Sequence, residues 1–260
     1  MTGDEGGRAL PVFLVEELEG AAEQGTPEEL HLTGEEARHA ATVLRMRHGE
    51  RLVLTDGHGR AARGEVRRVV PGRAPELVVD VDDRWEEPPP ALRVTVAQAL
   101  VKGDRAELAV ELATEAGADA LVPWQAERCV ARWQGSGRAA KGVARWRAAA
   151  RAAGKQARRL RLPDIGEPRT TPEVAELARQ ADAALVLDAR GATALQEATL
   201  PSRGELLLIV GPEGGITEPE LDTLTGAGAR PVRLGPSVLR ASSAAAVALG
   251  ALGALTDRWP

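Results

Sequence analysis

Three consecutive prolines at residues 88–90 divide the 260-residue chain into two parts with different patterns. Proline fixes φ and has no N–H group, so this run cannot lie inside a helix or a central strand and is typical of a stiff linker. Before it, short apolar segments are separated by turn residues; after it, strand-like and helix-like patterns alternate. We therefore predict a domain at residues 1–87, a linker at 88–91 and a second domain at 92–260.

The first part predicts a small β-rich domain. The pattern indicates a helix at 35–47, with Glu at its start and Arg at its end, as the helix dipole favours. Three β-type segments follow at 51–55, 61–69 and 76–81.

The second part predicts an α/β fold with a mainly parallel sheet. We expect strands at 92–101, 120–123, 184–188, 205–211 and 231–234, and helices at 104–116, 141–159, 218–225 and 243–255. The strands at 184–188 and 205–211 are apolar throughout, which is typical of strands covered on both faces.

Charge is distributed unevenly, although the net charge is only −5. Residues 128–161 hold eleven of the 33 Lys and Arg residues and no Asp or Glu. The guanidinium of arginine donates two parallel hydrogen bonds to phosphate, so we expect contact with a nucleic-acid backbone. An arginine-rich composition that merely solvates helix faces is the alternative. The chain has no Tyr and one Phe, which argues against an RNA-binding sheet that stacks bases on several aromatics.

Other features exclude several classes of protein. The single cysteine, Cys129, cannot form an internal disulfide, and we expect it to be inert in a reducing compartment. The longest apolar run, 241–255, is too short for a membrane span. The four histidines fit no metal-ligand spacing, so we expect neither a metal nor a membrane partner.

Two glycine–proline turns follow late strands. The strand at 205–211 runs into Gly211-Pro212-Glu213-Gly214-Gly215-Ile216, and the strand at 231–234 runs into Leu234-Gly235-Pro236 and then Val238-Leu239-Arg240. In open α/β sheets ligands bind beyond the carboxyl ends of the strands, and glycine lets a ligand approach the backbone. The sequence predicts a ligand site there, unless both are ordinary tight connections.

These motifs resemble the C-terminal signature of the ribosomal RNA small subunit methyltransferase E family, in the SPOUT superfamily. The resemblance covers nearly the whole chain. Related motifs are Lys102-Gly103-Asp104-Arg105 with the segment ending at Gly117, Glu127-Arg128-Cys129, Lys155-Gln156-Ala157-Arg158-Arg159, Pro163, and, in a PUA-like RNA-binding part, the segment 39–45, Gly49 and Asp56-Gly57. One departure is Ala241-Ser242-Ser243-Ala244, where the family commonly has Thr-Glu-Thr-Ala. A general base therefore cannot be carried over to Ser242.

The resemblance implies a small PUA-like β-barrel domain before a SPOUT domain with a C-terminal trefoil knot. It also implies a cytoplasmic homodimer that uses S-adenosylmethionine to methylate N3 of a uridine in 16S rRNA or the small ribosomal subunit. The alternatives are a SPOUT enzyme acting on another RNA, such as a tRNA ribose 2′-oxygen, and a non-catalytic RNA-binding factor of ribosome assembly.

The resemblance also suggests site residues. We expect Arg240 to stabilise the charge on the uracil, and Glu213 to hold the cofactor or accept a proton. The expected cofactor-binding residues are Leu187, Val210, Gly211, Pro212, Glu213, Gly215, Leu234, Gly235, Val238, Leu239, Arg240 and Ala244. The expected RNA-binding residues are Arg45, Arg47, Lys102, Arg105, Arg128, Arg132, Arg145, Lys155, Arg158 and Arg159.

Overall fold

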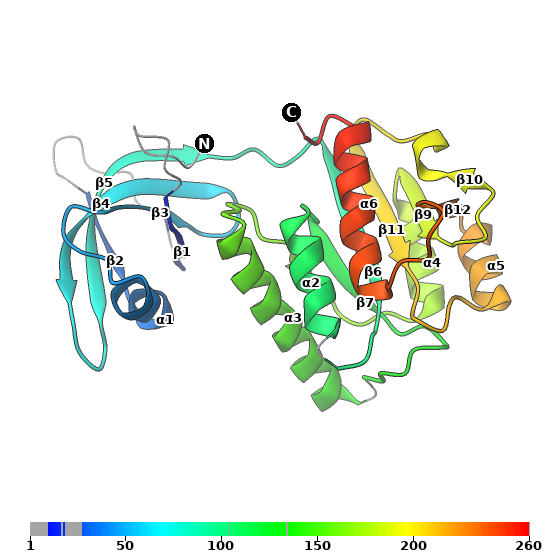
Figure 1. The fold of residues 1–260 in the computed structure, drawn as a ribbon, viewed down its shortest axis with the longest axis horizontal. Helices are drawn as coiled ribbons and strands as arrows, with labels where there is room; N and C mark the ends of the chain where they lie inside the picture. Colours follow the sequence, from blue (N-terminus) through cyan, green and yellow to red (C-terminus); the bar gives the residue numbers. More distant parts are fainter. Residues whose placement is uncertain (1–9, 17, 19–27, 104, 134, 260) are drawn as a thin grey trace. The chain divides into compact units, whose positions relative to one another are not determined.

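The structure, a computed structural model, describes residues 10–16, 18, 28–103, 105–133 and 135–259 (Figure 1). The chain forms two compact units. Unit 1 contains the described residues up to Pro88 together with Gly154–Leu162, and unit 2 contains Pro89–Ala153 and the described residues from Pro163 onwards. The segment 154–162, which we expected inside the 92–260 domain, therefore packs with unit 1. The domain limits 1–87 and 92–260 remain a prediction.

Unit 1 is built on a five-stranded sheet. Its strand order is β1 (Val12–Leu14), β3 (Arg51–Thr55), β4 (Arg60–Val70), β5 (Glu76–Glu86) and β2 (Glu28–Leu32). β1 pairs with β3 in parallel, and all the other pairs are antiparallel. The three β segments expected between 51 and 81 are confirmed as β3, β4 and β5, whereas the sequence reading missed β1 and β2.

The helix expected at 35–47 is wrong in its last four residues. α1 (Gly34–Arg38) continues as one π-helical segment (His39–Val43), and Arg45 then has a φ of 53°. This left-handed backbone cannot continue a right-handed helix. The side chains of Val43 and Leu44 are 66% and 47% exposed, so no packing against the core favours a longer helix there.

The segment 154–162 is tied to unit 1 by two polar contacts and an apolar one. The Lys155 Nζ lies 2.9 Å and 3.1 Å from the two carboxylate oxygens of Glu36, which is buried. The Thr55 hydroxyl donates to the carbonyl of Leu160 at 3.1 Å, and the Leu160 side chain packs with Val53. These contacts explain why nine residues leave the unit to which their neighbours belong.

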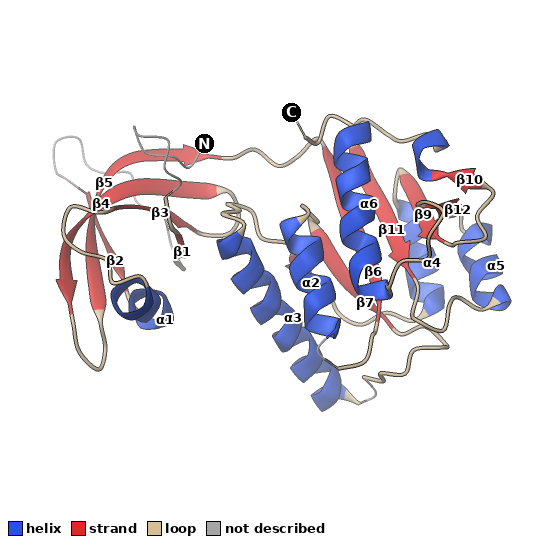
Figure 2. Cartoon of the chain, in the orientation of Figure 1, coloured by secondary structure: helices blue, strands red, loops and turns tan. Residues whose placement is uncertain are grey.

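Unit 2 is built on a seven-stranded sheet whose strand pairs are all parallel, as Figure 2 helps to follow. Its strand order is β10 (Thr193–Ala194), β12 (Arg230–Arg233), β9 (Ala183–Leu187), β11 (Gly204–Val210), β6 (Leu92–Ala99), β7 (Ala120–Trp124) and β8 (Asp164–Ile165). The expected parallel α/β fold is thus confirmed, and each of the five expected strands is present within two residues of its predicted ends.

The helices of unit 2 follow the expected alternation with one addition. They are α2 (Arg105–Glu115), α3 (Ser136–Gln156), α4 (Thr171–Gln180), α5 (Glu218–Gly226) and α6 (Ala241–Leu255), and a 3-10 turn spans Leu195–Glu197. α4 was not expected. α3 begins five residues earlier and ends three residues earlier than predicted, and its last three residues belong to unit 1. Asp104, the expected start of α2, lies outside the described residues.

The strand order places β9 between β11 and β12. The two strands that end in glycine–proline turns are therefore not neighbours, and the loop after β9 lies between their turns. The trefoil knot remains a prediction. Within the described ranges, no helix combines the length and the apolar character needed to cross a membrane.

Candidate active site

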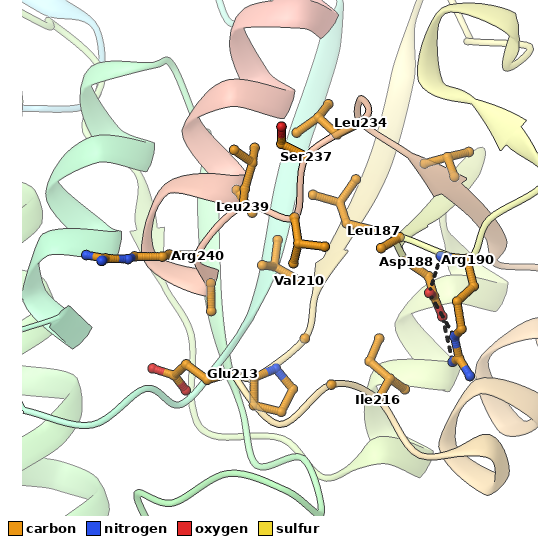
Figure 3. A pocket seen from close by; sticks show the side chains of 18 of the residues that line it. Leu187, Asp188, Arg190, Val210, Glu213, Ile216, Leu234, Ser237, Leu239 and Arg240 are labelled. Carbon is orange, nitrogen blue, oxygen red and sulfur yellow. Dashed lines mark hydrogen bonds and ion pairs between the residues drawn. The ribbon is translucent and has the colours of Figure 1, made fainter.

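A cavity of about 630 Å³ lies at the carboxyl ends of β9, β11 and β12 (Figure 3). Three loops form its walls: residues 187–190 after β9, 210–216 after β11, and 232–241 between β12 and α6. Its volume falls within the range of small-molecule and cofactor sites. The site therefore lies where an open parallel sheet usually binds its ligand.

All twelve residues expected to bind a cofactor line this cavity. The lining also includes eight residues that were not assigned to this site: Arg128, Asp188, Ala189, Arg190, Ile216, Val232, Ser237 and Ala241. Asp188 and Arg190 directly follow β9, just as Gly211 follows β11. Applying the carboxyl-end rule to β9 as well would have found them.

The loop after β11 is a tight turn. The backbone N–H of Gly215 donates to the carbonyl of Pro212 at 2.9 Å, and Gly215 has a φ of 76°. A Cβ at Gly211 would lie 2.7 Å from Cγ1 of Ile216. The first glycine is thus needed for the packing of Ile216, and Gly215 for its left-handed backbone.

Arg240 and Glu213 provide opposite charges at the cavity. Arg240 is the residue before α6, and its carbonyl accepts hydrogen bonds from the N–H groups of Ser243 and Ala244, both at 3.0 Å. Both charged side chains are exposed, and neither makes an ion pair within the described part of the chain. Figure 3 shows them on the same side of the pocket, with the guanidinium of Arg240 extending away from Leu239. The rim of the cavity thus has an available cation and an available carboxylate.

The loop after β9 has a different charge arrangement. Arg190 donates to Asp188 through Nε at 3.2 Å and Nη2 at 2.9 Å, and its Nη1 donates to Glu218. The hydrogen bond from the Arg190 side chain lowers the pKa of Asp188, although burial opposes this effect. Contacts with Asp188 and Glu218 raise the pKa of Arg190. The one cation, Arg190, is thus paired with two carboxylates, and these contacts tie the loop after β9 to the start of α5.

Comparison with known proteins shows the family to which this chain belongs. The model for an RNA methyltransferase domain matches residues 87–253, and the model for an RNA methyltransferase PUA domain matches residues 32–74. A ribosomal RNA small subunit methyltransferase E from Mycobacterium bovis is 51% identical over 230 residues, covering 87% of this chain and 86% of that protein. The protein of that name from Bacillus subtilis is 30% identical over 233 residues, covering 87% and 90%. The chain belongs to the ribosomal RNA small subunit methyltransferase E family.

Solved structures agree with this assignment. The methyltransferase E of Neisseria gonorrhoeae, bound to S-adenosylmethionine, has a TM-score of 0.79 and 28% identity, covering 95% of this chain and 98% of that chain. A Legionella pneumophila protein solved with the same cofactor has a TM-score of 0.80 and 27% identity, covering 96% and 99%.

The departure from the methyltransferase E pattern falls on a buried residue. Ser242 is 5% exposed and is not among the residues that line the cavity. Ser243 is exposed, and its hydroxyl donates to the carbonyl of Arg240 at 3.3 Å. Glu213 is therefore the carboxylate among the lining residues that has no ion-pair partner in the described chain.

All but one of the residues expected to bind RNA fall into two groups. Arg45, Arg47, Lys102, Arg105 and Arg158 are exposed, and no ion pair is recorded for them within the described ranges. Four others contact neighbouring groups: Arg128 with the carbonyl of Gly214, Arg132 with the carbonyls of Ala126 and Glu127, Arg145 with Glu107, and Lys155 with Glu36. Arg159 is half-buried.

Lys155 is the clearest exception to the expected RNA-binding role. Its side chain is only 22% exposed, and its charge is neutralised by Glu36, whose side chain is 10% exposed. Arg128 also differs from expectation, since it lines the cavity as well as carrying a charge. Two charges of the basic segment thus have structural contacts: Lys155 holds unit 1 together, and Arg128 contacts the candidate site.

Proposed function

We propose that this chain methylates N3 of a specific uridine in 16S rRNA, with S-adenosylmethionine as the methyl donor. The observation that carries the proposal is the cavity in the RNA methyltransferase domain, lined by all twelve residues expected to bind the cofactor. Relatives named methyltransferase E and a neighbour solved with bound S-adenosylmethionine support it.

The residues of the cavity fit this cofactor. Apolar side chains, including Leu187, Val210 and Ile216, would hold the adenine ring. A Cβ at Gly235 would have no neighbour within 4 Å, so this stretch of backbone is open to a ligand. The carboxylate of Glu213 suits a positively charged sulfonium. S-adenosylmethionine would supply a methyl group activated by that sulfonium.

Arg240 is assigned the stabilisation of the reacting uracil. N3 of uracil must lose its proton before or during attack, and the negative charge spreads onto the two carbonyl oxygens. A guanidinium held near these oxygens favours the anion more than the neutral base. Glu213 either holds the cofactor or accepts the proton. Holding both reactants in one cavity provides the orientation that a displacement reaction requires.

The exposed arginines would bind rRNA phosphates. Such contacts fix the register of the RNA without reading its bases. The PUA domain match over residues 32–74 includes Arg45 and Arg47, so unit 1 would contribute to the grip. A bacterial rRNA-modifying enzyme of this kind would work in the cytoplasm.

A homodimer is part of the proposal. Val238 is 83% exposed beside the cavity, and Val247 and Leu255 on α6 are 48% and 46% exposed. Apolar side chains exposed on one helix and the adjoining loop are what a second copy would cover. Sedimentation velocity on the purified chain tests this assignment, since a monomer at micromolar concentration would contradict it.

The main test is Arg240→Ala, assayed by methyl transfer to 16S rRNA and mapped by mass spectrometry. We expect methylation to be abolished and the melting temperature to be unchanged, because the side chain is exposed and makes no ion pair in the described chain. Arg179→Ala, an exposed arginine on α4, is the control and should retain full activity. Near-normal turnover by Arg240→Ala would contradict the assigned role.

Three further measurements separate the alternatives. Nucleoside analysis distinguishes N3-methyluridine from a ribose 2′-O-methyl product. Calorimetry measures whether the chain binds S-adenosylmethionine. A lack of binding would favour the non-catalytic assembly factor, which does not need this cofactor. Full modification of 16S rRNA in cells without the protein would refute the proposed function.

A further inference from the structure

A buried carboxylate lies in the first turn of α5, four residues after the cavity-lining Ile216. Glu220 is 6% exposed and accepts hydrogen bonds through both oxygens. Oε1 accepts from the N–H of Glu127 at 2.8 Å and from the hydroxyl of Thr171 at 2.9 Å. Oε2 accepts from the N–H and hydroxyl of Thr217 at 3.2 Å and 3.0 Å. One side chain thus joins the loop after β7, the start of α4 and the start of α5.

The contacts with Thr217 alone would be an ordinary helix cap. α4 has the same arrangement, in which Glu173 accepts from the N–H and hydroxyl of Thr170, both at 2.8 Å. Glu173, however, is half-exposed and has no hydrogen bond to a distant segment of the described chain. The two caps therefore separate the general role of such a carboxylate in starting a helix from any role specific to Glu220.

The additional contact with Glu127 leads to the cavity. Glu127 is followed by Arg128, whose Nη1 donates to the carbonyl of Gly214 at 3.0 Å and which lines the cavity. A Cβ at Gly214 would lie only 3.1 Å from Cβ of Arg128, so the two loops are in close contact. Thr217 comes directly after the loop 211–216. Glu220 therefore holds that loop from both sides: through Thr217 at its end and through the Glu127–Arg128 backbone against its middle.

We propose that Glu220 is a positioning residue for cofactor binding, which fixes the loop 211–216 in its binding conformation through Glu127 and Arg128. This inference rests on the proposed function. It gives Arg128 a role in the cavity in place of the RNA contact expected from the sequence.

The proposal requires the ionised carboxylate. Two backbone N–H groups and the Thr171 hydroxyl donate to Glu220, and the single proton of the Thr217 hydroxyl is shared between Oε2 of Glu220 and, at 3.1 Å, Oε2 of Glu127. An ionised carboxylate accepts on both oxygens without a proton of its own. Burial alone would raise the pKa of Glu220, but the hydrogen bonds from Glu127, Thr217 and Thr171 together hold it below its ordinary value. Glutamine has the same shape but would place an NH₂ group against one pair of donors.

The test compares Glu220→Gln with Glu173→Gln. Calorimetry gives the Kd for S-adenosylmethionine, and methyl-transfer kinetics give kcat and the KM for the same cofactor. We expect Glu220→Gln to weaken the affinity about 10-fold and to raise KM in parallel, while kcat at saturating cofactor stays within about 2-fold. Glu173→Gln should lower only the melting temperature. Equal effects of the two substitutions on the Kd would overturn the proposal, because they would show a general effect of helix capping.

A double-mutant cycle with Arg128→Ala tests the route. If Glu220 acts through Arg128, Glu220→Gln should weaken binding little further in the Arg128→Ala background, whereas independent effects would add. Additive losses would refute the route. If Glu220→Gln does not fold, Thr171→Val removes one hydrogen bond to Glu220, together with the one that the hydroxyl accepts from Nε1 of Trp124 at 3.2 Å, and should shift the Kd in the same direction. An unchanged Kd would again refute the proposal. Failure of the wild-type chain to bind S-adenosylmethionine would instead refute the proposed function.

Discussion

The left-handed backbone of Gly215 gives a quantitative test of the cavity. At a φ of 76°, a Cβ at this position would approach nothing closer than Nη1 of Arg128 at 4.0 Å. Gly215→Ala therefore introduces backbone strain without a steric clash. An L-residue other than glycine in this conformation costs about 1–2 kcal/mol.

The strain can appear in two measurable ways. If the loop keeps its conformation, the whole cost lowers stability, and the melting temperature should fall by roughly 2–4 °C per kcal/mol for a chain of this size. If the loop relaxes until the cofactor binds, binding must restore the strained conformation. The Kd for S-adenosylmethionine should then rise by about 5–30-fold.

Gly228→Ala is the matched control. Gly228 has a φ of 95°, its Cβ would also meet nothing within 4 Å, and it lies after α5 rather than on the cavity wall. Gly228→Ala should lower the melting temperature without changing the Kd for S-adenosylmethionine. Calorimetry and thermal unfolding on both variants separate strain from binding. If Gly215→Ala changed neither the melting temperature nor the Kd, the argument from backbone conformation would be refuted.

Two further predictions concern other parts of the chain. Lys155→Met leaves the buried carboxylate of Glu36 without its ammonium partner, so it should lower the free energy of unfolding, measured by urea titration, by about 3 kcal/mol. Lys141→Met, at an exposed site on α3, is the control and should have little effect. Equal stabilities of the two variants would contradict the structural role of Lys155. Cys129 is 4% exposed, and burial raises the pKa of its thiol. Iodoacetamide at pH 8 should therefore alkylate this thiol only after denaturation, which mass spectrometry can measure. Rapid labelling of the native chain would contradict this prediction.

The sequence was most informative where local pattern and chemistry coincide. The apolar run of β11 is buried on both faces, so its composition alone predicted a central parallel strand. The turns at Gly211 and Gly235 follow strands, and the general rule for open α/β sheets predicts a ligand site at their ends, where the structure has a cavity. Helix boundaries were less certain, because the helix expected at 35–47 depended on how Val43 and Leu44 pack, and both prove to be exposed.

By itself, then, the sequence determined the fold class, the family and twelve of the residues that line the cavity, because each depends on short-range patterns or motifs. Tertiary structure alone decided which charges are free and which are paired. Lys155 and Arg128 look alike in a strip of eleven basic residues, yet one meets Glu36, 119 positions away, and the other meets Gly214, 86 positions away. Glu220 resembles any carboxylate in the first turn of a helix until the fold brings Glu127 and Thr171 against it. Such partners are distant along the chain, and only the packed structure brings them together.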